Sequence, residues 1–333
     1  MKNLEEKFQA MLSCVNLLKE NLNISQIEAL TETFDNLETG KIKVEEGAPD
    51  EATVQQLSAA YQALNYEDWS GKLKGEVFTY LSLKAISDDG LDANSMPTPI
   101  IISTVIAMMM DKMLPKQEMK LLDPAIGSGS LVYSVVEQLK QSNHSKNFFQ
   151  IAGIDHNEDL LSLADVGAHV RHNEVELAHQ DAILPWILDQ PDVVVSDLPI
   201  GYYPLDDNVK NFDLRANEGH SFAHFVYLEQ IVKNLKENGW GFLIVPKSML
   251  TGPAASEVMS WMTKKVYLRA IVELPDKLFK QQAFAKSILV FQNHGQNSQA
   301  SEVLLSKLTQ LDETALFRFN ESLDKWYTKF NKR

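Results

Sequence analysis

Residues 121–130 have the sequence LLDPAIGSGS, which leads from a short apolar run into the helical pattern LVYSVVEQLK. Gly127 and Gly129 let the backbone turn sharply and approach a ligand closely, and the helix that follows presents free N–H groups. In an open α/β sheet, the first turn from strand to helix lies at the carboxyl ends of the strands, where ligands bind. The pattern therefore predicts a ligand loop, with Asp123 at the strand end as a hydrogen-bond acceptor.

A plain loop is the alternative, because the tripeptide Gly-Ser-Gly is a weak signal by itself. The glycine spacing fits neither Gly-x-Gly-x-x-Gly nor Gly-x-x-x-x-Gly-Lys-Ser/Thr, which disfavours dinucleotide sites and P-loop phosphate sites. The sequence around the loop has to decide between these alternatives.

Short apolar runs alternate with helical patterns from residue 120 onward. The strand candidates are KLLD (120–123), FQIAGID (149–155), HQDA (around 179–182), DVVVSD (192–197), GWGFLIVP (239–246), LRAIVELP (268–275) and SILVFQN (287–293). Strands rich in Val and Ile that alternate with helices predict an α/β fold, a parallel and doubly wound sheet with helices on both faces.

The first 85 residues have a different pattern, with apolar side chains at helical spacing. Asp50 is an N-cap candidate for a helix that we expect to run from about residue 51 through Tyr61, Tyr66 and Trp69. The polar stretch SDDGLDANSMPTP then marks a domain boundary, after which IIISTVIAMMMDKML predicts an apolar helix. We expect a helical N-terminal domain over 1–95, an α/β domain over 96–295, and a strand and a helix in 296–333.

Composition excludes several classes of protein. Of the 333 residues, 44% are hydrophobic and 23% charged, as in a globular protein. No apolar run reaches the roughly 18 residues of a membrane span, and the N-terminus lacks a signal-peptide pattern. Cys14 is the single cysteine, which excludes an internal disulfide and a cysteine metal cluster and favours a reducing compartment.

The charge is unevenly distributed along the chain. A net charge of -14 argues against nucleic-acid binding through a uniformly basic surface. Residues 264–333 nevertheless hold twelve basic and seven acidic side chains, which leaves a local basic face. The loop LFKQQAFAKS within it carries Phe279, Gln281, Gln282 and Phe284 beside Lys277, Lys280 and Lys286, and is either a polynucleotide contact or a solvated loop.

Further acidic residues follow the predicted strands. Asp155 ends the second strand, where a carboxylate can accept hydrogen bonds from both ribose hydroxyls; its alternative role is an N-cap. Asp181 can accept from the exocyclic amine of an adenine, with Ile154, Ala182 or Ile183 packing on the ring; its alternative is a turn before Pro185.

The stretch DVVVSDLPIGYYP (192–204) places polar and aromatic residues after an apolar strand. Asp197 can accept a hydrogen bond from an amino group, Pro199 fixes the loop, and Tyr202 or Tyr203 offers a face to a planar ring. The alternative is an ordinary turn whose aromatic side chains pack between domains.

In this order, the motifs DPAIGSG, GID, QDA and SDLPIGYYP resemble those of the class I S-adenosylmethionine-dependent methyltransferases. Within that class they resemble the N6-adenine DNA methyltransferases and the modification subunits of type I restriction systems. The resemblance covers about residues 96–295, including Thr98-Pro99 before the apolar helix. It implies a doubly wound, Rossmann-like methyltransferase sheet with S-adenosyl-L-methionine as cofactor, in a cytoplasmic protein.

Carried over by position, the resemblance implies a role for each motif residue. The residues it assigns to cofactor binding are Thr98, Asp123, Pro124, Ala125, Gly127, Gly129, Asp155, His156, Asp181, Ala182 and Asp197. Those it assigns to the methyl-acceptor site are Asp197, Pro199, Tyr202 and Tyr203. The family's acceptor motif reads Asn/Asp/Ser-Pro-Pro-Phe/Tyr, whereas here Leu198 replaces one proline and Ile200 the aromatic residue.

These features predict methyl transfer to an amino nitrogen, with adenine N6 of DNA as the acceptor. The alternatives are a degenerate cofactor-binding module with a regulatory or interaction role, and methylation of a protein amide or a small molecule. His220 and His224 lie four residues apart, on one face if helical, but lack a third ligand, so we expect no metal. The expected partners are DNA at the basic C-terminal face and a protein at the helical N-terminal domain.

Overall fold

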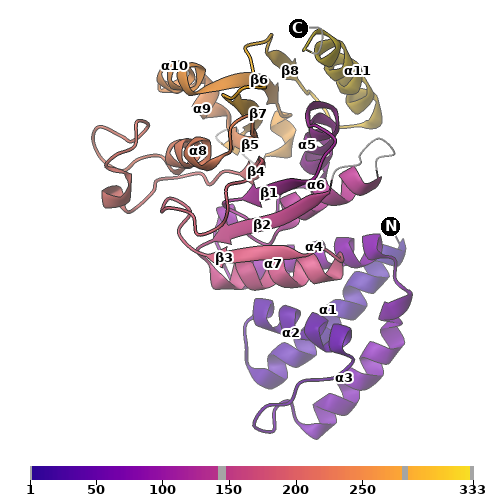
Figure 1. Ribbon diagram of the computed structural model, residues 1–333. Helices are drawn as coiled ribbons and strands as arrows, with labels where there is room; N and C mark the ends of the chain where they lie inside the picture. Colours follow the sequence, from indigo (N-terminus) through magenta and orange to yellow (C-terminus); the bar gives the residue numbers. More distant parts are fainter. Residues whose placement is uncertain (1, 142–147, 280–283, 331–333) are drawn as a thin grey trace. The chain divides into compact units, whose positions relative to one another are not determined.

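The computed structural model describes residues 2–141, 148–279 and 284–330 (Figure 1). The chain divides into two compact units. The first consists of Met1–Pro97, Gly127–Tyr133 and Asn157–Val175, and the second of Thr98–Ile126, Ser134–His156 and Glu176–Arg333. The loop after the first strand and one helix of the α/β stretch thus belong to the first unit.

Helices build the first unit. They are α1 (Lys2–Leu22), α2 (Gln26–Thr39), α3 (Glu51–Leu64), α4 (Gly71–Asp88) and α7 (Glu158–Val170). Asp50 caps α3 as predicted, because its carboxylate accepts a hydrogen bond from the Thr53 N–H at 2.7 Å. The prediction that this helix continues through Tyr66 was wrong: Asn65 adopts a left-handed conformation (φ 49°) and ends α3.

α7 packs into the core of the helical unit. Leu160, Leu163, Val166 and Val170 of α7 join one apolar cluster with residues of α1 to α4. The Arg171 guanidinium, just after α7, donates to the Gly75 carbonyl at 2.7 Å and to Thr79 Oγ1 at 2.6 Å. The first unit therefore draws its core from two distant parts of the sequence.

The second unit contains an eight-stranded sheet of order β3-β2-β1-β4-β5-β7-β6-β8 (Figure 1). Its strands are β1 (Met119–Asp123), β2 (Phe149–Asp155), β3 (Val175–His179), β4 (Val193–Asp197), β5 (Trp240–Pro246), β6 (Val266–Glu273), β7 (Lys286–Asn293) and β8 (Leu304–Lys307). The α/β class and the methyltransferase-like sheet are confirmed.

Two details of the predicted sheet were wrong. β7 runs antiparallel to both β5 and β6, so the sheet is mixed rather than parallel. β3 ends at His179, which is the first residue of the predicted strand HQDA (around 179–182). A turn replaces the strand there: Asp181 accepts from the Ile183 N–H through Oδ1 and from the Leu184 N–H through its carbonyl, both at 3.0 Å.

Helices lie on both sides of the sheet. They are α5 (Ile100–Met113), α6 (Ser130–Gln141), α8 (Ala223–Asn234), α9 (Lys247–Thr251), α10 (Ala255–Lys265) and α11 (Glu313–Phe330). Figure 1 shows α8, α9 and α10 on one side and α5 and α11 on the other. Leu228 of α8 and Met262 of α10 are fully buried in one cluster with residues of β4, β5 and β7.

The most apolar segment, α5, is a core helix. Its 14 residues are fewer than the about 20 that a membrane span needs. Met109 and Met110 of its methionine run are 0% exposed, as expected for core side chains. Across 2–141, 148–279 and 284–330, no helix is both long and apolar enough to cross a membrane.

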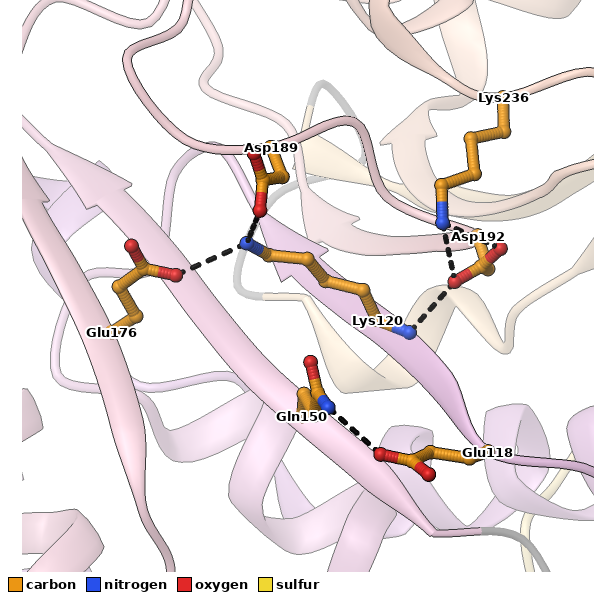
Figure 2. Close-up of polar contacts among 7 residues, drawn as sticks. All are labelled: Glu118, Lys120, Gln150, Glu176, Asp189, Asp192 and Lys236. Carbon is orange, nitrogen blue, oxygen red and sulfur yellow. Dashed lines mark hydrogen bonds and ion pairs between the residues drawn. The ribbon is translucent and has the colours of Figure 1, made fainter.

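Ionic contacts hold together the end of the sheet where β1 and β4 begin (Figure 2). The Asp192 carboxylate accepts from the Lys120 backbone N–H at 2.9 Å and from Lys236 Nζ at 2.9 and 3.0 Å. Lys120 Nζ in turn contacts Glu176 at 3.0 Å and Asp189 at 3.5 Å. Asp192 thus fixes the position of β1 beside β4.

We expect Asp192→Ala to lower the free energy of unfolding by about 1 to 2 kcal/mol, because the Lys120 N–H loses its charged acceptor. The control is Asp189→Ala, whose side chain is 93% exposed and should cost less than about 0.5 kcal/mol. Urea unfolding of both variants measures the difference, and equal losses would contradict the role given to Asp192.

Candidate functional site

Three adjacent parallel strands, β2, β1 and β4, each end in an aspartate: Asp155, Asp123 and Asp197. We call this end of the sheet the carboxyl edge. The chain passes from β1 to β2 on one side and returns to β4 on the other, so the strand order reverses at β1. Ligands of open α/β sheets bind at such a reversal, outside the carboxyl ends of the strands.

Asp123 is the most deeply buried of the three aspartates, at 1% exposure. Its Oδ1 accepts hydrogen bonds from Ser196 Oγ at 2.7 Å and from the Ala125 N–H at 3.0 Å, on the far side of Pro124. Burial raises the pKa of Asp123 to about 7; the two hydrogen bonds oppose that rise, and the charges of Asp197 and Asp155 add to it. Near neutral pH its carboxyl group therefore exists in both protonation states.

The loop after β1 has the backbone geometry that its glycines predict. Gly127 and Gly129 have φ values of +54° and +73°, which side chains rarely permit. A Cβ on Gly129 would lie 2.1 Å from the ring of Tyr133, within the same unit. In the second unit, the Ile126 N–H donates to the Ile154 carbonyl at 3.0 Å, which joins the start of the loop to β2.

Asp155 lies at the end of β2 and is 8% exposed. His156 follows it with a 79% exposed side chain, whose Nδ1 lies 3.5 Å from Asp155 Oδ1. The alternative role of Asp155 as a helix cap was wrong, because the Asn157 side chain accepts from the Leu160 N–H and caps α7.

Asp181 and Ala182 lie in the turn after β3. Tyr203 donates its hydroxyl to Asp181 Oδ2 at 2.5 Å, and Asn208 donates to the same hydroxyl oxygen at 2.7 Å. Ala182 is 2% exposed and packs against the apolar end of β2. The structure thus connects the turn after β3 with the loop after β4.

Asp197 receives contacts from two other elements. Thr98 Oγ1, just before α5, donates to Asp197 Oδ2 at 3.1 Å, and Lys286 Nζ, at the start of β7, lies 2.5 Å from Asp197 Oδ1. Leu198 separates Asp197 from Pro199; it is 0% exposed and packs in the core beneath the loop. Sequence reasoning placed Lys286 in a basic loop and missed its ion pair with Asp197.

The two tyrosines of the loop after β4 have different surroundings. Tyr203 is 6% exposed and bound to Asp181, whereas Tyr202 is 63% exposed. Tyr202 stacks on Phe222 with ring centroids 4.8 Å apart, and the two residues form an antiparallel bridge. Phe222 is itself 41% exposed, so this pair offers an aromatic surface that the sequence alone did not reveal.

The two histidines lie in different surroundings. His220 precedes α8 and pairs with Asp206 at 2.9 Å, whereas His224 lies within α8 and is buried. They therefore do not share a helix face. Burial lowers the pKa of His224 to about 4, so it is a neutral ring at physiological pH, packed edge-on against Phe225.

The hydrogen-bond acceptors at this edge of the sheet fit the polar groups of S-adenosylmethionine. The carboxylates of Asp155 and Asp181 can accept hydrogen bonds from ribose hydroxyls and an adenine amine. The left-handed glycines of the loop after β1 keep side chains away from its backbone.

A family model described as N-6 DNA Methylase matches residues 69–327. The chain belongs to the N-6 DNA methylase family. The matched range contains the three strand-end aspartates and the ion pair between Asp197 and Lys286. The resemblance found in the sequence motifs is confirmed, and with it a place among the S-adenosylmethionine-dependent methyltransferases.

Two relatives resemble this family member along almost their whole length. The Bacillus subtilis protein YtxK, described as uncharacterized, is 34% identical over 319 residues, which cover 94% of both chains. A Listeria monocytogenes protein, a candidate class I S-adenosylmethionine-dependent methyltransferase, has a crystal structure with a TM-score of 0.86 and 32% identity. That match covers 98% of this chain and 99% of the other.

Restriction-modification proteins resemble this methylase-family chain more distantly. The methylase subunit of the type I restriction enzyme EcoEI from Escherichia coli is 24% identical over 256 residues, which cover 72% of this chain and 51% of that subunit. The type I methyltransferase subunit of Streptococcus thermophilus has the same fold, with a TM-score of 0.66 and 16% identity; the match covers 96% and 73% of the two chains.

The basic C-terminal face is partly neutralised. Within residues 264–333, Lys307 contacts Glu273, Lys329 contacts Glu302, and Lys286 contacts Asp197. Lys280, Gln281 and Gln282 of the expected nucleic-acid loop lie outside the described residues. DNA binding at this face and protein binding at the helical unit stay predictions.

The pKa of Asp123 predicts how stability depends on pH. Its carboxyl is raised from 3.8 to about 7 in the folded state, so its contribution to stability is fully present below pH 4 and is lost as pH rises through 7. Between pH 5 and pH 8 we expect the free energy of unfolding of Asp123→Asn to rise by about 3 kcal/mol relative to the unsubstituted protein.

Urea unfolding of both proteins at pH 5 and pH 8 measures this change. The matched control is Asp159→Asn, which removes an exposed carboxylate and should show no such trend. A difference between the Asp123 variant and the unsubstituted protein that stays constant with pH would contradict the raised pKa.

Proposed function

We propose that this protein is an S-adenosylmethionine-dependent methyltransferase that transfers a methyl group to an amino nitrogen, with adenine N6 of DNA as its acceptor. The observation that carries the proposal is the position of Asp197 at the carboxyl end of β4, where Thr98 Oγ1 donates to one carboxylate oxygen. A partly exposed carboxylate at this place can accept a hydrogen bond from a target amine. Membership of the N-6 DNA methylase family supports adenine N6 as the acceptor.

The cofactor-binding residues in this proposal follow the carboxyl edge. Asp155 accepts hydrogen bonds from the ribose hydroxyls, and Asp181 accepts one from the adenine amine while Tyr203 holds its other oxygen. Asp123 stays hydrogen-bonded to Ser196 and fixes the loop that begins at Pro124.

Methyl transfer needs little acid or base chemistry from the protein. S-adenosylmethionine supplies an electrophilic methyl carbon bound to a sulfonium. With that cofactor bound, the acceptor nitrogen would form a bond to this carbon as the electrons of the S–C bond return to sulfur, and the nitrogen would then release a proton to water. Asp197 orients the N–H group so that its lone pair points at the methyl carbon, which lowers the entropic cost of in-line attack.

Tyr202 is the aromatic residue that we assign to the acceptor base. It is exposed and supported by Phe222, whereas Tyr203 is buried against Asp181. Stacking of a base on an aromatic ring is worth about 1 to 3 kcal/mol, which would offset the missing ring at Ile200. The exposed pair Tyr202 and Phe222 supports a planar acceptor rather than a purely aliphatic one.

Asp155→Ala should weaken S-adenosylmethionine binding by about 2 kcal/mol, or roughly 30-fold, because the ribose hydroxyls lose a charged acceptor. Isothermal calorimetry measures the affinity. Asp159→Ala removes an exposed carboxylate four residues further on and should leave the affinity unchanged. Unchanged binding by Asp155→Ala would refute the ribose assignment.

Transfer itself is tested with methyl-labelled S-adenosylmethionine, unmethylated duplex DNA and total cell protein in separate reactions. We expect label in adenine N6 of the DNA. Asp197→Ala should reduce transfer at least about 100-fold, because Asp197 orients the acceptor, while the affinity for S-adenosylhomocysteine, whose sulfur is uncharged, changes less than about threefold.

Each other outcome of the transfer experiment has a distinct meaning. Label in protein alone would replace the DNA acceptor with a protein amide. Cofactor binding without label in either acceptor would favour the regulatory module, and equal loss of binding and transfer in Asp197→Ala would make Asp197 a cofactor ligand only.

A further inference from the structure

Lys286 forms an ion pair with Asp197, the same residue that contacts the methyl acceptor in the proposed function. Lys286 is the first residue of β7 and lies opposite Pro246 of β5 in the antiparallel ladder. Its side chain reaches across β5 to the end of β4, where Nζ lies 2.5 Å from Asp197 Oδ1.

Both partners are largely withdrawn from solvent. The side chains of Lys286 and Asp197 are 18% and 21% exposed, whereas those of the neighbouring pair Lys247 and Glu273 are 26% and 35% exposed. Salt screens buried charges less than surface charges, so the charge of Lys286 acts strongly on its surroundings. The acceptor carboxylate is thus neutralised within the fold.

We propose, on the basis of the proposed function, that Lys286 is a specificity-determining residue that restricts the methyl acceptor to an uncharged nitrogen. A lone carboxylate at the end of β4 would attract an ammonium group. The pair of Asp197 and Lys286 has no net charge, so it offers an ammonium no such attraction. The acceptors that fit are the amine of a nucleobase or a carboxamide, and those excluded are protonated alkyl amines such as a lysine side chain.

The hydrogen-bond count agrees with this assignment. A carboxylate has about four acceptor positions, of which Thr98 and Lys286 take one each. The remaining positions can accept an N–H group from an uncharged acceptor. Lys286 therefore does more than stabilise the fold. Its charge offsets that of Asp197, the residue proposed to accept a hydrogen bond from the reacting nitrogen.

Two nucleoside ligands test the charge at Asp197 without any acceptor. S-adenosylhomocysteine has a neutral sulfur, whereas sinefungin carries an amine, protonated at neutral pH, in place of the methylated sulfur. Lys286→Met should increase the affinity for sinefungin relative to that for S-adenosylhomocysteine about tenfold, because Asp197 is left uncompensated. Lys286→Arg, which keeps the charge, should leave the ratio unchanged.

Lys247→Met is the matched control, because it removes a neighbouring lysine charge that pairs with Glu273 and Asp276 instead. It should not change the ratio. An unchanged ratio in Lys286→Met, or an equal change in Lys247→Met, would overturn the inference and leave the proposed function standing. If neither nucleoside binds the unsubstituted protein, the proposed function fails and this inference fails with it.

Label transfer gives a second readout with defined acceptors. The unsubstituted protein should label a duplex oligonucleotide with unmethylated adenines or a glutamine peptide, and should not label a lysine peptide. Lys286→Met should reduce the preference for the uncharged acceptor at least tenfold, and Lys286→Arg should restore it. Labelling of the lysine peptide by the unsubstituted protein would overturn the inference; if no acceptor is labelled, the binding ratio decides.

Discussion

The structure depends on three carboxylates that end adjacent parallel strands. Asp155, Asp123 and Asp197 terminate β2, β1 and β4; burial raises the pKa of the middle one, and the charges of the outer two add to that rise. Bringing like charges together with partial burial is costly unless each charge is neutralised or hydrogen-bonded. The contacts at this edge meet that requirement: Asp123 accepts hydrogen bonds and takes up a proton near neutrality, and Asp197 pairs with Lys286.

The mixed sheet supplies the compensating lysine. If β7 ran parallel to β5, its first residue would lie at the opposite end of the sheet from Asp197. Because β7 is antiparallel, its first residue, Lys286, instead lies beside the carboxyl ends of β4 and β5. The reversed strand that sequence patterning failed to predict is therefore what brings a cation to Asp197.

Local sequence predicted the strand ends better than the contacts between them. The apolar runs before Asp123, Asp155 and Asp197 identified β1, β2 and β4 because buried parallel strands read as continuous apolar segments. Strand direction and the pairing of Lys286 depend on residues about 90 positions apart, which leave no local pattern. The stacking of Phe222 on Tyr202 likewise joins two separate segments and left no local pattern, although both residues are aromatic.

Charge compensation also bears on how an acidic protein can approach a polyanion. The chain carries a net charge of -14, and an uncompensated cluster of aspartates at the carboxyl edge would repel phosphate groups from that edge, where we propose that the acceptor binds. Partial protonation of Asp123 and the ion pair at Asp197 lower that local charge without removing the hydrogen-bond acceptors of Asp197. The edge can then present oxygen atoms to an amine while adding little repulsion toward a nucleic acid. The acidity of the whole chain is thus compatible with a nucleic-acid acceptor, because the charge that matters is the local one.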